Sequence, residues 1–465
     1  MTTSVAPYGI FSVYGIELEY MIVDRNTLDI LPIADRVLKD AGGGDVFEAA
    51  LGDVGWSNEL VMHVLEMKTN GPAAGLKGLS ARFHQHIQHA NRLLLRYDAC
   101  LLPSGMHPWM DPGKETHIWP HEQNEIYRAY DRIFGVRGHG WSNLQSTHIN
   151  LPFGDEEEFA RLHAAIRLIL PLIPAIAAAS PFVEGVPTGL LDTRLHYYSR
   201  NQQRIPAIAG RVIPEAIHSF DQYDERILKV ISRDIAPHDP ARILQPEWLN
   251  SRGAIARFER GAIEIRLIDV QECPATDMAI AALITQGIRA LFEERWFSIE
   301  KQHGFDENSL ADILAACIKT GEDTPIYDRS YARLFSADAL SVPTAGALWR
   351  SIAARLQDEG VDFSPYQPVL GMILQNGTLA GRLLRAYHRM EADDEPSSAF
   401  QPANGQQNQT YAPLSPSPQM RRLRAIYQKL AGCLADNTIF EATSSDESAT
   451  KWISSDHASF DETSR

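Results

Sequence analysis

Carboxylates alternate with apolar side chains in a short segment near the start of the chain. Ile16, Leu18 and Tyr20 alternate with Glu17 and Glu19. Successive side chains of an extended strand point to opposite faces, so a strand here would carry both glutamates on one face and the apolar residues on the other. Two carboxylates held side by side on a rigid strand are suited to binding a divalent cation.

Three later segments have the same spacing of two residues between polar side chains on an apolar background. They place Glu66 with Lys68 in Val64–Lys68, His148 with Asn150 in Thr147–Leu151, and Glu264 with Arg266 in Ala262–Leu267. The ordinary interpretation is a set of half-exposed antiparallel strands whose polar faces meet water. The residue types on these polar faces favour another interpretation. Strand faces that meet water usually mix Lys, Thr, Gln and Ser, whereas glutamate is the most frequent residue on these faces.

Several carboxylates converging on one sheet face would repel one another unless cations neutralise them. Oxygen ligands with one imidazole suit Mg²⁺ or Mn²⁺. Two or three such ions could gather phosphate oxygens. We therefore expect the four segments to meet in one sheet, although the sequence does not show which strands pair.

Phosphate-binding motifs built on glycine are absent from the sequence. There is no GxxxxGK[ST], no GxGxxG that opens a helix and no HExxH. ATP would have to be held through metal ions and basic side chains. Arg257 and Arg260, next to the Glu264 segment, are candidate phosphate contacts, and ordinary surface arginines of a hairpin are the alternative.

Composition narrows the class of protein. The 465 residues carry 43 Lys and Arg against 59 Asp and Glu, a formal charge of −16, which argues against partners such as nucleic acid or an anionic membrane. The apolar run 168–179 contains two prolines and is too short to span a bilayer. The start has no signal-peptide pattern, and the four cysteines form no CxxC pair. A soluble cytoplasmic protein is expected.

The chain divides by composition near residue 390. Residues 1–390 alternate strand-like and helix-like patches, with 309–390 mainly helical, and form the expected catalytic domain. Residues 391–417 are rich in Pro, Gln, Asn and Ser and indicate a linker. Gln419–Leu434 could form one amphipathic helix, and the acidic, Ser-rich end from Asp436 is expected to be mobile.

Six ordered blocks in roughly the first 300 residues resemble glutamate–cysteine ligase family 2, the carboxylate–amine ligases with a glutamine-synthetase-like fold. The blocks are GIELEYMIVD (Gly15–Asp24), NELVMHVLEMKTNGP (Asn58–Pro72), LLPSGMHPWMDP (Leu101–Pro112), STHINLPF (Ser146–Phe153), SPFVEGVPTGLLDTRLHYY (Ser180–Tyr198) and ARFERGAIEIRLIDVQECP (Ala256–Pro274). GIELEY alone is only moderately specific, whereas the ordered set is strong.

The resemblance implies an α+β fold in which a curved antiparallel sheet forms a funnel flanked by helices. ATP and divalent cations would lie at one end and the amino acids at the other. The γ-phosphate of ATP would pass to a carboxylate, and an amine would attack the resulting acyl phosphate. Catalysis of this kind is mostly positioning and neutralisation of charge by metal ions.

The resemblance also assigns residues. Its implied metal ligands are Glu17, Glu19, Glu66, His148 and Glu264. Arg266, with Glu66, is implied at the catalytic centre as a phosphate or transition-state contact, and Arg194 resembles the arginine that grips an amino-acid carboxylate. Glu59 and His107 are weaker candidates for substrate binding. Segment 200–217 matches nothing in the family pattern and lies where an amino-acid pocket would be closed. The resemblance therefore does not identify the amine substrate, and it does not establish that this substrate is cysteine.

Three hypotheses follow. The first is an ATP- and Mg²⁺-dependent ligase that joins the side-chain carboxylate of glutamate, or a relative, to an amine. The second is a metal-dependent amide hydrolase that activates water on the same acidic face. The third is a non-catalytic binding or assembly protein that kept the fold. For the ligase the partners would be small molecules, and a symmetric homo-oligomer is the common state of a cytosolic enzyme.

Overall fold

The four acidic segments are strands of a single sheet. The computed structural model describes residues 8–44, 48–336, 341–394 and 417–442. Within them an eight-stranded sheet runs in the order β2-β3-β4-β1-β6-β10-β9, with β5 also pairing with β1, and every strand pair is antiparallel. The strands are β1 (Gly15–Asp24), β2 (Glu48–Leu51), β3 (Val54–Asn58), β4 (Val64–Thr69), β5 (Ala99–Leu102), β6 (Ser146–Pro152), β9 (Ala254–Arg257) and β10 (Ala262–Asp269).

The register places the polar residues of β4, β1, β6 and β10 on the same face. Glu17 lies opposite Lys68 on one side and His148 on the other, and Glu19 lies opposite Glu66. Directly opposed residues in antiparallel strands project to the same side of the sheet. The expected convergence is therefore confirmed, with β1 at its centre.

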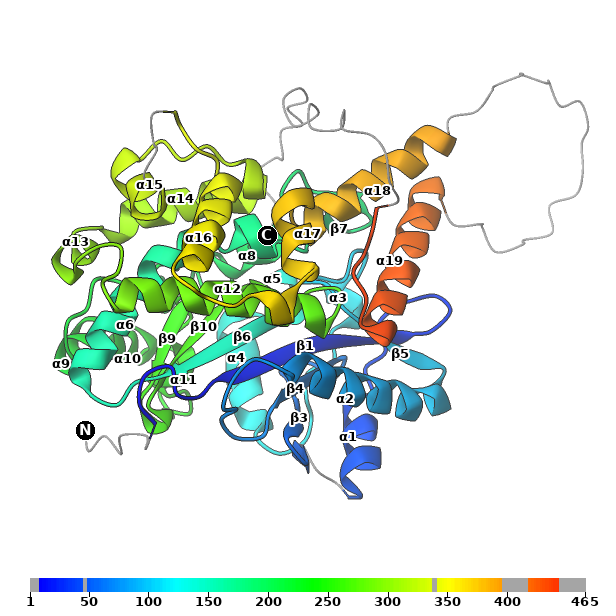
Figure 1. Ribbon diagram of the computed structural model, residues 1–465. Coiled ribbons are helices and arrows are strands. Elements are labelled where there is room, and N and C mark those ends of the chain that lie inside the picture. Colours follow the sequence, from blue (N-terminus) through cyan, green and yellow to red (C-terminus); the bar gives the residue numbers. More distant parts are fainter. Residues whose placement is uncertain (1–7, 45–47, 337–340, 395–416, 443–465) are drawn as a thin grey trace, which may run out of the picture.

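Helices cover the opposite, apolar face. Ile16, Leu18 and Tyr20 are fully buried there. Thr147, which alternates with His148, donates from Oγ1 to Asp277 Oδ1 of α12 at 2.7 Å, which fixes this helix to the sheet. Figure 1 shows α12 on one side of the sheet and α4 on the other. The α+β class with an antiparallel sheet flanked by helices is confirmed.

The remaining elements are mostly helical. The longer helices are α1 (Ala34–Gly42), α2 (Leu79–Leu94), α4 (Asn124–Phe134), α6 (Glu156–Ile169), α12 (Pro274–Phe292), α14 (Glu307–Thr320), α16 (Ala345–Asp358), α17 (Val369–Asn376), α18 (Leu379–Asp394) and α19 (Pro418–Asp436). The shorter ones are α3 (Pro112–Glu115), α5 (His139–Ser142), α7 (Pro174–Ala177), α8 (Thr193–Tyr198), α9 (Phe220–Tyr223), α10 (Lys229–Ile235), α11 (Pro246–Leu249), α13 (Ile299–His303) and α15 (Arg329–Phe335). A two-stranded ribbon pairs β7 (Phe182–Val183) with β8 (Val186–Pro187).

The C-terminal helices pack against the body of the protein. On α19, the side chains Leu423, Ile426 and Leu430 join a buried cluster with Met21 of β1 and Leu102 of β5. Helix α18 runs through the expected boundary at residue 390, and α19 covers the segment predicted as an amphipathic helix. The rest of the expected linker, 395–416, and the tail 443–465 lie outside the described residues.

No helix in the described ranges combines the length and the apolar character that crossing a bilayer requires. All four cysteines fall within those ranges and are free thiols.

Candidate active site

Glu17 and His148 form the centre of the acidic face. Glu17 Oε2 lies 2.8 Å from His148 Nδ1, and Asn150 Nδ2 donates to Glu17 Oε1 at 3.1 Å. Burial acts to raise the pKa of Glu17, but the His148 hydrogen bond and Arg260 outweigh it and the pKa lies below its usual value. Burial and Arg266 act to lower the pKa of His148, yet Glu17 and Glu19 raise it overall. The pair thus combines an ionised carboxylate with an imidazole whose protonated form is stabilised.

Glu19 is held by the start of β6. Its Oε2 accepts from the backbone N–H of Ser146 at 2.7 Å and from the Ser146 hydroxyl at 3.0 Å. The same hydroxyl lies 2.8 Å from His148 Nε2. The carboxylate is therefore fixed in orientation next to the imidazole.

Glu66 and Glu59 extend the acidic face toward β3. Glu66 Oε1 accepts from Ser57 Oγ at 2.6 Å and lies 3.2 Å from Lys68 Nζ. Burial is the main cause that raises the pKa of Glu66, and Glu17 raises it further. Burial together with Glu66 and Glu19 raises the pKa of Glu59 well above its usual value. These carboxylates repel one another, which a bound cation would relieve.

The geometry of this cluster fits divalent metal ions. One ligand atom from each of Glu17, Glu66 and His148 lies within 4.8 Å of the others, and the same holds for Glu19, Glu59 and Glu66. Glu66 belongs to both groups, so it would be a ligand for a metal ion held by either group. Carboxylate oxygens with one imidazole nitrogen are the donor set that suits Mg²⁺ or Mn²⁺.

Glu264 does not join either group of ligand atoms. Its carboxylate accepts from Arg257 Nε at 2.9 Å and pairs with the guanidinium of Arg266. Burial would raise its pKa, but Arg266 and Arg257 lower it far below the usual value. The resemblance placed Glu264 among the metal ligands. In the structure its charge is already balanced by two arginines, and Glu59 takes the place beside Glu19 and Glu66.

Two cavities open on either side of the acidic face. The first, called the Arg260 cavity, has a volume of about 790 Å³ and is lined by Tyr8, Tyr14, Glu17, Lys68, Asn70, Asn150 and Arg260, among others. The second, the Arg266 cavity, has a volume of about 220 Å³ and is lined by Glu19, Glu59, Tyr127, His148, Arg194, Trp248 and Arg266, among others. Glu17 of β1 thus lines the first cavity, and Glu19 of the same strand lines the second.

The two arginines expected at ATP lie in different settings. Arg260 is exposed, lines the Arg260 cavity and has its Nη1 3.9 Å from Glu17 Oε1. Arg257 pairs with Glu264 and donates from Nη1 to the carbonyl of Glu247 at 3.2 Å. The structure therefore brings Arg260, and not Arg257, to a cavity beside the acids.

Arg194 lines the Arg266 cavity but already grips a carboxylate of its own chain. The residue is 1% exposed, its Nε donates to Asp269 Oδ1, and its Nη2 lies 3.3 Å from the carbonyl of Arg266. Helix α8 positions it, because Asp192 caps the helix by accepting from the N–H of Leu195 at 2.8 Å. Any contact between Arg194 and a substrate would have to use N–H groups of the guanidinium that Asp269 and the Arg266 carbonyl do not occupy.

His107 is not brought to the acidic face. It is fully buried, with Nε2 2.8 Å from the carbonyl of Leu28 and Nδ1 accepting from the N–H of Trp109 at 3.3 Å. Burial lowers its pKa to about 4. The side chain holds a turn together, so the substrate-binding role expected for it is not retained.

Several residues at the site were not among the predicted ones. Lys68 and Asn150 were identified by the same spacing of two residues as Glu66 and His148, but no role at the site was assigned to them. Tyr127 and Trp248 line the Arg266 cavity from α4 and α11. Nothing in the local sequence of these two helices distinguishes such aromatics from ordinary core residues.

The family match places the chain among the carbon–nitrogen ligases. The family model described as glutamate–cysteine ligase family 2 matches residues 13–405. The chain belongs to this family, as the ordered sequence blocks indicated.

Two relatives and one solved structure are similar to the chain. An uncharacterised protein of Archaeoglobus fulgidus is 40% identical over 280 residues, which cover 60% of this chain and 75% of the relative. A protein of Rubrobacter xylanophilus, provisionally named glutamate–cysteine ligase 2-3, is 25% identical and covers 75% of this chain and 87% of its own. A bifunctional glutathione synthetase from Pasteurella multocida shares the fold, with a TM-score of 0.55 at 13% identity. The match covers 92% of this chain but only 53% of that protein.

Proposed function

We propose that the protein is an ATP- and Mg²⁺-dependent ligase that joins the side-chain carboxylate of glutamate, or a close relative, to an amine such as cysteine. The observation that carries this proposal is the position of Glu17, Glu19 and His148 between two cavities. A phosphoryl donor in one cavity and its acceptor carboxylate in the other would meet at the acidic face. Family membership supports the same reaction class.

The Arg260 cavity is the better fit for ATP. Its volume of about 790 Å³ lies in the range that holds ligands of this size. Arg260 and Lys68 supply positive charge for phosphates, while Tyr8 and Tyr14 offer aromatic surface. The pKa of Lys68 lies above its usual value because Glu66 and Glu48 outweigh its burial, so it stays charged.

Glu17, Glu19, Glu59, Glu66 and His148 would hold the metal ions. Bound Mg²⁺ or Mn²⁺ would neutralise the phosphate oxygens during transfer and the carboxylates that now repel one another. The hydroxyls of Ser57 and Ser146 orient the carboxylates of Glu66 and Glu19 through hydrogen bonds. The chain thus provides a rigid set of ligands before substrates arrive.

The Arg266 cavity would take the carboxylate to be activated. Arg266 pairs with Glu264 on the floor of the site, which fixes the guanidinium beside His148 and Glu19. There it could stabilise the charge that develops on the phosphoryl group in transit.

A mass-spectrometric search for the condensed product tests the proposal. The protein is incubated with ATP, Mg²⁺, glutamate and pooled amines, and phosphate release is followed in parallel. We expect a product at the mass of glutamate plus amine less water, with phosphate release that depends on the amine. Amide cleavage without ATP would support the hydrolase instead, and a folded protein inert in both assays would support the non-catalytic alternative.

A further inference from the structure

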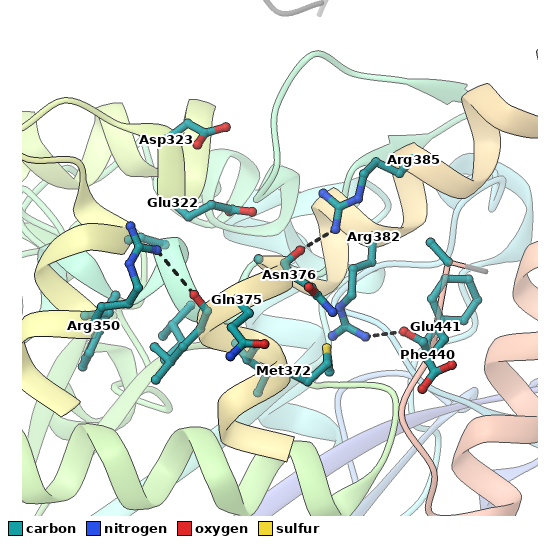
Figure 2. Close-up of a pocket in the computed structure, with 18 of the residues that line it drawn as sticks. Glu322, Asp323, Arg350, Met372, Gln375, Asn376, Arg382, Arg385, Phe440 and Glu441 are labelled. Atoms are coloured by element: carbon teal, nitrogen blue, oxygen red, sulfur yellow. Dashed lines mark hydrogen bonds between the residues drawn. The ribbon is translucent and has the colours of Figure 1, made fainter. Parts of the chain in front are cut away.

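A third cavity lies away from the acidic face, between α16, α17 and α18. It has a volume of about 950 Å³ and shares no lining residue with the Arg260 or Arg266 cavities. We call it the α18 cavity. Figure 2 shows the side chains of Arg382 and Arg385 extending into it from α18, with Arg350 on the facing wall.

The α18 cavity has an unusual concentration of arginine. Arg382, Arg385 and Arg389 are spaced three and four residues apart, so they share one face of α18. Arg350 of α16 adds a fourth guanidinium. Like charges gathered on one wall oppose one another, and the pKa of Arg385 is lowered by burial and by its two helix neighbours despite Glu322 and Asp323.

Arg382 has hydrogen-bonding capacity that the described protein does not use. The residue is 2% exposed, and its Nη1 donates to Glu272 Oε1 at 2.7 Å and to the carbonyl of Phe440 at 2.6 Å. Its Nε and Nη2 are buried and meet no hydrogen-bond acceptor among the described residues. Leaving buried donors unpaired is costly, so an acceptor from a ligand would be favourable here.

The acids that line the cavity do not satisfy these arginines. Glu322, next to α18, accepts from the N–H of Thr378 at 3.2 Å and from its hydroxyl at 3.1 Å. Burial raises its pKa, which reduces its negative charge. Asp323 and Glu441 are exposed. Gln375 and Asn376 of α17 add neutral polar surface, and the carbonyl of Asn376 accepts from Arg385.

We propose that the α18 cavity binds a small multivalent anion, one that carries two or more phosphate or carboxylate groups. The anion would accept from Arg382 and Arg385 on one side and from Arg350 on the other. Guanidinium groups bind both kinds of oxyanion through paired hydrogen bonds. The site is separate from the proposed reaction, so its occupancy is measured without turnover.

Isothermal titration calorimetry on the full chain tests the proposal. Inorganic diphosphate and citrate are titrated separately at constant ionic strength, in buffer freed of divalent metal and containing no chelator, with acetate as the monovalent control. We expect one saturable site for diphosphate, for citrate or for both, and none for acetate. The response to the two probes identifies whether phosphate or carboxylate groups are preferred.

Matched arginine variants locate the site. Arg385→Gln and Arg350→Gln should each weaken binding about tenfold, since a hydrogen bond to a charged group contributes that much. Arg355→Gln on the same helix as Arg350 is the control, because Arg355 pairs with Glu359 and does not line the cavity. The control should bind as the unchanged protein does.

Four outcomes would overturn the proposal. The first is that neither probe binds saturably. The second is that Arg355→Gln weakens binding as much as Arg385→Gln does. Alternatively, Arg260→Gln abolishes binding while Arg385→Gln does not, which would place the anion in the Arg260 cavity. Finally, probes bind only after Asp446→Asn with Glu447→Gln, which would make the acidic segment that follows Ala442 the occupant.

Discussion

Glu17 on β1 and His148 on β6 are cross-strand neighbours joined by a hydrogen bond of 2.8 Å, although 131 residues separate them in the chain. This contact brings together acids that would otherwise belong to separate strands. It also balances part of their charge, because the imidazole favours its proton beside Glu17 and Glu19. The site can therefore fold before a metal ion binds.

Replacing both central acids should abolish turnover without unfolding the protein. In Glu17→Gln with Glu19→Gln the side chains keep their size but lose the charge that would bind metal ions, so we expect a loss of about a thousandfold or more. Amine-dependent phosphate release measures the effect, and far-ultraviolet circular dichroism checks the fold. Glu125→Gln, an exposed site on α4, is the matched control. Wild-type turnover by the double variant would exclude these acids from catalysis.

Divalent metal should stabilise the folded protein. Mg²⁺ or Mn²⁺ at a hundred times its dissociation constant would add about 2.7 kcal/mol to the free energy of unfolding, because only the folded chain assembles the ligands. EDTA should remove this gain. Urea unfolding with and without metal measures it, and Glu66→Gln should respond least because Glu66 belongs to both ligand groups. An equal gain in that variant would place the metal elsewhere.

Removing the guanidinium of Arg194 should destabilise the fold as well as affect substrate binding. Arg194→Ala leaves the fully buried carboxylate of Asp269 without its partner, and breaking such a pair costs about 3–5 kcal/mol. Urea unfolding measures the loss. Arg194→Ala combined with Asp269→Asn should recover part of it, since no unpaired charge remains. Additive losses in the double variant would mean that the two side chains are not coupled.

Asp277 should make the protein less stable as the pH rises toward neutrality. Burial raises the pKa of this carboxyl to about 7, above its value in the unfolded chain. The folded state therefore holds the proton more tightly, and the stability this contributes is complete below about pH 4 and is lost by about pH 7. The slope approaches about 1.4 kcal/mol per pH unit in that window. Asp277→Asn should flatten the curve of unfolding free energy from pH 5 to 7, and parallel curves would contradict the assignment.

The strands of the acidic face could be predicted from sequence because alternation fixes which side chains share a face. This logic reached Glu17, Glu19, Glu66 and His148, and the register then placed them together. Pairing itself was not readable, since strands far apart in the chain meet through tertiary packing. Glu264 shows the limit of this reasoning. Its position in the alternating pattern was read correctly, but the pattern does not show that Arg257 and Arg266 pair with its carboxylate.

The residues that helices and loops contribute to the cavity walls could not be predicted from the sequence, for a different reason. Tyr127 and Trp248 reach the site only through the placement of α4 and α11, which local periodicity does not encode. His107 shows the reverse, because a histidine in a matching block proved to hold a turn. Arg194, which the resemblance assigned to a substrate carboxylate, lines a cavity, but its pairing with Asp269 could not be read from the sequence.

Helix α19 packs beside β1 and β5, so the last helix of the described residues helps to keep water from the first strand. Shortening the chain at residue 390 would uncover Met21, Val23 and Leu102, side chains that now exclude water beside Leu423 and Ile426. Exposed apolar edges of this kind invite aggregation. Fragments used for crystallisation or assay should therefore extend through Phe440, whose backbone also anchors Arg382.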